Sequence, residues 1–385
     1  MTTLLLVIIY VAFISLGLPD SMLGAAWPVM QGELGLPLAG AGLVSMIVSG
    51  STIISSLFSG VLIRRLGTGK LTLFSVLMTA LALLGYSFSQ NYLWLCLIAI
   101  PLGLGAGSVD ASLNDFVARN FAARHMNWLH SFWGVGATTG PLIMAFMLNQ
   151  TGRWQMGYRT VAIIQFTLVA ILAVSLPLWQ RFPTPTSQHA AAGRVKIRNI
   201  KGIAPNLVAF FAYCAVETST GLWAASFLVE QRGLSRVLAA GGASAYYLGI
   251  TLGRFLNGFL ASHFEAKNLV RGGQALILLG IVLMFLPFPI LSLAGLMVVG
   301  LGCAPIFPTL LHETPRRFGA ENSASLMGLQ MAVAYCGLTL MPPLLGLIVD
   351  RFGLQLYPFG LLLLALMLTL GSERLNRVLA GQQAQ

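Results

Sequence analysis

The chain has 385 residues, of which 57% are hydrophobic and 9% charged, and its formal net charge is +11. Because a soluble domain carries about 25% charged residues, this composition excludes an ordinary soluble protein and predicts an integral membrane protein. The apolar runs have the length of membrane helices, about 20 residues, rather than that of barrel strands. The first run continues through Trp27 without a charged leader, so we expect a membrane helix there and no cleavable signal peptide.

Hydropathy predicts twelve membrane helices and one long connection between them. The expected helices lie at 4–30, 38–63, 70–89, 91–118, 126–148, 158–180, 204–230, 237–262, 271–287, 290–312, 322–349 and 354–371. The connection is polar and basic and contains Pro183 and Pro185. We therefore expect an all-α membrane fold with an N-terminal six-helix bundle at 1–180, a cytoplasmic linker at 181–203 and a C-terminal six-helix bundle at 204–385.

The basic residues are unevenly distributed between the two sides of the membrane. With a cytoplasmic N-terminus, 16 of the 22 Lys and Arg residues lie on the cytoplasmic side and 5 on the other, and Arg254 lies within a helix. This imbalance predicts that both termini of the multi-pass protein are cytoplasmic. The positive charge is thus a topology signal and a contact for lipid headgroups, and it does not indicate a nucleic-acid partner.

The two expected halves share weak sequence echoes in the same order. GLGAGSVDASLND in the fourth helix corresponds to GLGCAPIFPTLLHE in the tenth, and GVGATTGPLIM in the fifth to CGLTLMPPLLG in the eleventh. GVLIRRLGTGK follows the second helix, and GFLASHFEAKN follows the eighth. Repeated halves with a binding site between them are typical of secondary transporters.

The twelve helices, the central basic linker and the turn after the second helix resemble the major facilitator superfamily. The turn motif of that family matches at Gly60, Arg65 and Gly67, whereas Arg64 stands where the family has an aspartate. This departure weakens the gating salt bridge that the motif implies. The resemblance implies two pseudo-symmetric six-helix bundles that work by alternating access.

Within that family the chain resembles the branch of the fucose–proton symporter, in which the turn motif is often degenerate. The segments that carry this resemblance are GLPDSMLGAAWP, the Asp110 and Asn114 pair, NWLHSFWGVGA with Asn127 and His130, YCAVETSTGLWAASFL, and GRFLNG. The resemblance implies uptake of a sugar together with a proton.

Asp20 and Asp110 are the candidate proton-coupling residues. A carboxylate at bilayer depth costs roughly 2.5–3.5 kcal/mol on insertion scales, so water, a proton or a polar ligand must offset it. Asp110 and Asn114 are four residues apart and share one helix face, and Asp115 can reach Arg119 in the same way. The alternatives are a structural Asp110 and an Asp20 that caps the second part of a broken helix.

The candidate substrate contacts are polar and aromatic residues within the expected helices of both halves: Asn114, Asn127, His130, Glu217, Trp223, Trp27, Gln330 and Tyr335. Carboxylates accept hydrogen bonds from sugar hydroxyls, and indole rings offer an apolar face with one donor. Arg254 needs a partner at bilayer depth. Glu217 can either form a structural ion pair with Arg254 or bind the sugar, and the sequence leaves both open. His130 can likewise bind the solute or only pack against neighbouring helices.

The sequence contains no phosphate-binding loop, no nucleophile elbow and no cluster with metal-ligand spacing, so we expect no enzyme activity, cofactor or metal site. The four cysteines lie in apolar segments and are expected to pack as small core residues. The prediction is a monomeric secondary transporter that takes up a sugar or similar small polar solute with protons, surrounded by membrane lipids. Proton-coupled drug efflux is the alternative, and a receptor that only binds would not need these acids.

Overall fold

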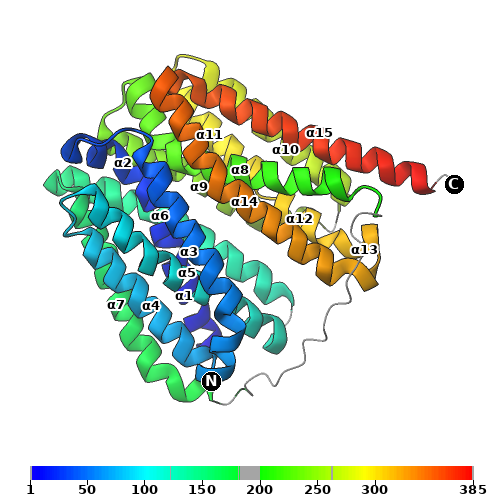
Figure 1. Ribbon diagram of the computed structural model, residues 1–385, viewed down its shortest axis with the longest axis horizontal. Helices are drawn as coiled ribbons and strands as arrows, with labels where there is room; N and C mark the ends of the chain where they lie inside the picture. Colours follow the sequence, from blue (N-terminus) through cyan, green and yellow to red (C-terminus); the bar gives the residue numbers. More distant parts are fainter. Residues whose placement is uncertain (1, 122, 181, 183–199, 262, 384–385) are drawn as a thin grey trace.

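The computed structural model describes residues 2–121, 123–180, 182, 200–261 and 263–383. For a few of them, including residues 320–325 and Asn127, it describes the backbone but not the side chain. Residues 183–199, which form most of the expected linker, lie outside the described residues. The described chain is almost entirely helical (Figure 1).

The first half consists of helices that run mostly from one end of the molecule to the other. Their bounds are α1 (Thr2–Asp20), α2 (Met22–Leu34), α3 (Gly40–Leu66), α4 (Thr68–Tyr86), α5 (Tyr92–Asn120), α6 (Ala123–Thr151) and α7 (Trp154–Trp179).

The second half is built in the same way, with two short helices inserted before its longest helix. Its elements are α8 (Ile203–Arg232), α9 (Arg236–Leu260), α10 (Ala266–Phe285), α11 (Pro289–Cys303), α12 (Ile306–His312), α13 (Thr314–Phe318), α14 (Ala320–Phe352), the 3-10 turn η2 (Leu354–Leu356) and α15 (Tyr357–Gln383).

The all-helical membrane fold predicted from the sequence is confirmed. Among the described residues, eleven helical stretches are long and apolar enough to cross a membrane. α9 supplies a twelfth long helix, which is less apolar because it carries Arg254 and Asn257. The expected first helix is divided into α1 and α2 at Ser21, and the expected tenth is divided at Ala304 and Pro305 into α11 and α12. A proline lies beside each division, at Pro19 and at Pro305. Because proline lacks the N–H that continues the hydrogen bonding of a helix, it accounts for both breaks.

The helices pack in two groups that touch each other through a few defined pairs. α3 packs on α5, α1 on α6 and α4 on both α5 and α7, whereas α8 packs on α14 and α15 and α9 on α11. The two groups meet where α6 packs on α9, α3 on α14 and α2 on α8. Figure 1 shows the groups together near α2 and diverging toward the N-terminus and α13. The diverging end is the one that the loop charges assign to the cytoplasm.

The end at which the groups meet is closed by a hydrogen bond and by direct backbone contact. The Leu38 N–H donates to Asp350 Oδ1 at 2.8 Å, which links the loop after α2 to the end of α14. A Cβ atom added at Gly24 would lie 2.7 Å from the Leu222 carbonyl oxygen, and one at Gly42 would lie 2.6 Å from the Cα of Pro343. Only glycine allows backbones to approach this closely.

Candidate functional site

Four side chains from both halves form a continuous chain of contacts in the middle of the molecule. The Trp133 indole N–H on α6 donates to Asp20 Oδ2 at the end of α1, over 2.8 Å. The Arg254 guanidinium on α9 lies 4.9 Å from the centre of the Trp133 ring. An Arg254 amino group is 3.3 Å from Glu217 Oε1 on α8. We call this series, Asp20–Trp133–Arg254–Glu217, the central polar chain.

The central polar chain is accessible, although all four residues belong to membrane-length helices. Asp20 is exposed, Trp133 is half-buried, and the side chains of Arg254 and Glu217 are each 19% exposed. Each residue contacts the next across a helix boundary, and the contact between Trp133 and Arg254 crosses from one half to the other. Charged groups within membrane-length helices belong to protein interiors or water-filled passages, and this chain lies at a contact between the two halves.

The backbone near the central polar chain brings the helices close enough for these contacts. A Cβ atom at Gly134 would lie 2.5 Å from Thr251 Oγ1, which shows how tightly α6 approaches α9. The hydroxyls of Thr138 and Thr251 are 3.2 Å apart across the same contact. The Tyr246 hydroxyl donates to the Glu217 carbonyl oxygen at 2.8 Å and joins α9 to α8. The position of Arg254 between Trp133 and Glu217 follows from this packing.

Asp110 has a different environment from Glu217. Asn114 Nδ2 donates to Asp110 Oδ1 at 2.9 Å and to the Asp110 carbonyl oxygen at 3.0 Å, as the four-residue spacing predicts. Both residues are half-buried on α5. The helix-end pair of Asp115 and Arg119 also forms. Among the described residues, neither Asp110 nor Asp20 forms an ion pair, whereas Glu217 does.

Three of the predicted substrate contacts lie in packed interiors and hydrogen-bond to other parts of the protein. The Trp27 indole donates to the Leu38 carbonyl oxygen, and the Trp223 indole donates to the Pro342 carbonyl oxygen, both at 3.0 Å. Gln330 is fully buried; its side chain donates to Asn206 and accepts a hydrogen bond from Thr314. The structure does not bring these three into the central polar chain.

The remaining candidates lie nearer to it. His130 is exposed on α6, its ring meets the Phe13 ring edge-on at 5.9 Å, and its carbonyl oxygen is 3.4 Å from the Arg254 guanidinium. Tyr335 is half-buried on α14. Asn127 lies in α6, but its side chain is outside the described part of the structure.

Trp133 is absent from the substrate contacts predicted from the sequence, although it is an aromatic residue of the same kind as Trp27 and Trp223. The sequence does contain a signal for it: Trp133 follows His130 by three residues, so the two side chains share one face of the helix. A tryptophan in the middle of a membrane helix is also far from the interface, where tryptophans usually anchor. Among the described residues no three His, Cys, Asp or Glu side chains are grouped so as to hold a metal ion.

Comparison with known proteins identifies the family. The model of the Major Facilitator Superfamily matches residues 9–243 and 206–373, which together span nearly the whole chain. The protein therefore belongs to the Major Facilitator Superfamily. The protein is a transporter, like the members of its family and the relatives named below, and it is not an enzyme.

Two curated relatives and one solved structure illustrate the similarity. The glucose/mannose transporter GlcP of Bacillus subtilis (strain 168) is 28% identical over 276 residues, which cover 66% of this chain and 66% of that relative, just under two thirds. The hexuronate transporter of the same organism is 24% identical, over 87% of this chain and 85% of its own. A bacterial homologue of the human lysosomal transporter Spinster, in an inward-facing and occupied conformation, aligns with a TM-score of 0.76 at 11% identity. That alignment covers 98% of this chain and 96% of the other.

Proposed function

We propose that the protein takes up a neutral sugar together with a proton by alternating access. The observation that carries this proposal is the central polar chain, which joins two carboxylates, an indole and a guanidinium across the two halves. A transporter of this family must bind its solute where the halves face each other. The similarity to a glucose/mannose transporter supports a sugar as that solute.

The proposed sugar site consists of hydrogen-bonding groups beside the central polar chain. Glu217 keeps one carboxylate oxygen that accepts hydrogen bonds from sugar hydroxyls, while the other faces Arg254. Asn114 and His130 add polar groups from the first half, and we keep Asn127 and Tyr335 as proposed contacts. We propose that the Trp133 ring provides the aromatic contact with the sugar that we predicted for Trp223 and Trp27, because Trp133 is half-buried whereas the other two are fully buried.

The charges favour a neutral solute over an acidic one. Arg254 is the cation of the central polar chain, and Glu217 and the Trp133 ring already engage its guanidinium. Asp20 and Asp110 add negative charge without a cationic partner among the described residues. The carboxylate of a hexuronate would meet net negative charge there, so we propose a neutral hexose although one relative is a hexuronate transporter. Lipophilic cations, the solutes of the efflux alternative, suit the charges but lack support from either relative.

The proposed coupling uses Asp20 and Asp110 as proton carriers. A carboxylate at bilayer depth without an ion pair is the kind of group that binds a proton when water leaves it. Protonation of Asp20 would remove the negative charge at one end of the central polar chain and weaken its bond with Trp133. That bond lies within the first half, and its loss releases the Trp133 ring, whose contact with Arg254 joins the two halves, so proton binding and the change of access are linked.

Solute counterflow in proteoliposomes tests this proposal. Labelled glucose should accumulate transiently against excess unlabelled glucose, and glucuronate or a lipophilic cation should not compete. Glu217→Gln should weaken sugar binding, whereas Glu230→Gln, at an exposed position of the same helix, should not. Competition by a lipophilic cation but not by sugars would reject the sugar site in favour of efflux.

Further parts of the proposal are a monomer in a bacterial inner membrane, contacts with lipids, and both termini in the cytoplasm.

A further inference from the structure

A proline at the end of α1 leaves one backbone carbonyl group without its helical partner. Pro19 has no N–H, so the carbonyl oxygen of Ser15, four residues earlier, cannot accept the usual helical hydrogen bond. Gln165 on α7 supplies the missing donor, because its Nε2 is 2.9 Å from the Ser15 oxygen. The single proton of the Thr79 hydroxyl on α4 is within reach of Gln165 Oε1, at 2.8 Å, and of the Val76 carbonyl oxygen, at 2.9 Å. These bonds join three helices at a site directly before Asp20.

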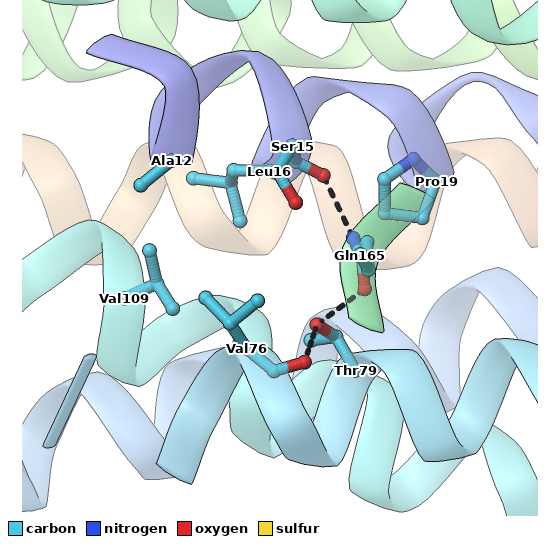
Figure 2. Close-up of a pocket in the computed structure, with 8 residues that line it drawn as sticks. All are labelled: Ala12, Ser15, Leu16, Pro19, Val76, Thr79, Val109 and Gln165. Carbon is cyan, nitrogen blue, oxygen red and sulfur yellow. Dashed lines mark hydrogen bonds between the residues drawn. The ribbon is translucent and has the colours of Figure 1, made fainter. Parts of the chain in front are cut away.

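A small cavity lies beside these bonds. Figure 2 shows Ser15 on one side of it, Val76 and Thr79 on the opposite side, and Gln165 between them. The cavity volume is about 10 Å³, which is the lower limit for a single water molecule and far too small for a sugar.

The Ser15 hydroxyl is the second observation. Ser15 lines the cavity and is only 4% exposed, and its Oγ has no hydrogen-bond partner within the protein. A buried hydroxyl without a partner costs about 1–3 kcal/mol, so a ligand in the cavity is expected to meet it. Gln165 and Thr79 also line the cavity and keep acceptor capacity at Oε1 and Oγ1, while its other lining residues are apolar.

We propose that this cavity is a binding site for one ordered water molecule, which bridges Ser15 Oγ to the Gln165–Thr79 pair and completes the hydrogen bonding at the break in α1. Water suits the site because it both donates and accepts, and the neighbours are all neutral. A sodium ion would need about six oxygen ligands and some negative charge, by analogy with other hard cations, and this site offers three neutral oxygens. The water site belongs to the fold and does not depend on the proposed sugar or proton chemistry.

Ser15→Ala separates a bound water from an unpaired hydroxyl by the sign of its effect. If the hydroxyl binds water, removing it takes away one of the water's ligands and lowers the melting temperature of the purified protein. If the hydroxyl is unpaired, removing it relieves an unmet polar group, and the melting temperature stays the same or rises. The matched control is Ser112→Ala, which truncates a buried serine that already donates to the Val109 carbonyl oxygen.

A crystal structure at a resolution that shows ordered water gives the direct result. We expect density within hydrogen-bonding distance, about 2.7–3.2 Å, of Ser15 Oγ and of Gln165 or Thr79. A dry cavity, or a melting temperature that stays the same or rises in Ser15→Ala, would overturn the proposal. A melting temperature that depends on replacing sodium with potassium would show a cation instead and overturn it too. None of these readouts requires transport, so a failure of the sugar assay would leave them unchanged.

Discussion

The ion pair of Arg254 and Glu217 lends itself to a quantitative test. Arg254→Met removes the cation while keeping a long apolar side chain, and so leaves the Glu217 carboxylate unpaired. Removing one partner of a buried pair costs about 3–5 kcal/mol. Because each side chain is 19% exposed, water compensates part of this, and we expect about 2 kcal/mol from the lost pair. The lost contact with the Trp133 ring adds about 1 kcal/mol, for a total of about 3 kcal/mol.

The double variant with Glu217→Gln gives the decisive comparison. It removes both charges, so only the contact with Trp133 is lost, and about 2 kcal/mol of the destabilisation should be recovered. Thermal unfolding in detergent should therefore rank wild type as most stable, the double variant next and Arg254→Met last. Arg236→Met, at an exposed position in the first turn of the same helix, is the control and should melt like wild type. A double variant that melts below Arg254→Met would refute the pairing and show that each charge stabilises the protein on its own.

Three further predictions concern coupling, orientation and the closed end. Asp20→Asn and Asp110→Asn should each reduce sugar accumulation driven by a pH gradient while leaving sugar exchange measurable; full accumulation in both variants would place the proton elsewhere. A cysteine introduced as Ser187→Cys should resist an impermeant maleimide in right-side-out vesicles until they are lysed, and labelling of intact vesicles would reverse the predicted topology. Asp350→Ala removes the acceptor for the Leu38 N–H, worth about 1 kcal/mol, and should shift the equilibrium toward separation of the halves at that end by about fivefold. Spin-label distances across that end measure the shift, and an unchanged distribution would contradict it.

Helix geometry explains why part of the site could be predicted from the sequence. The hydrogen bond between Asn114 and Asp110 and the pair of Asp115 with Arg119 both follow from a spacing of four residues, which fixes the helix face without any knowledge of the fold. The expected helices were found for a similar reason, because the length of an apolar run is set by the thickness of the bilayer.

Contacts between distant helices could not be predicted in this way. Trp133 and Asp20 are 113 residues apart in the chain, and their contact depends on how α6 packs against α1. Trp223 and Gln330 show the converse, since a polar or aromatic residue within a membrane helix is equally suited to a solute and to a neighbouring helix. Trp223 hydrogen-bonds to a carbonyl on α14, and Gln330 to a side chain on α8. The sequence shows which polar and aromatic side chains each helix contains, but the packing of the helices determines which group each side chain contacts.

The glycines at the closed end have a consequence for how easily the two halves can part. At Gly24 and Gly42 the halves touch backbone to backbone, so at these two positions no side chain of α2 or α3 enters the other half. Interlocked side chains would have to leave fitted holes together and lose many dispersion contacts at once. A contact between backbones has no such interlock to undo, so glycine at these two positions favours separation of the halves. In the alternating access that we propose, these glycines lower the resistance that the binding free energy of the solute has to overcome.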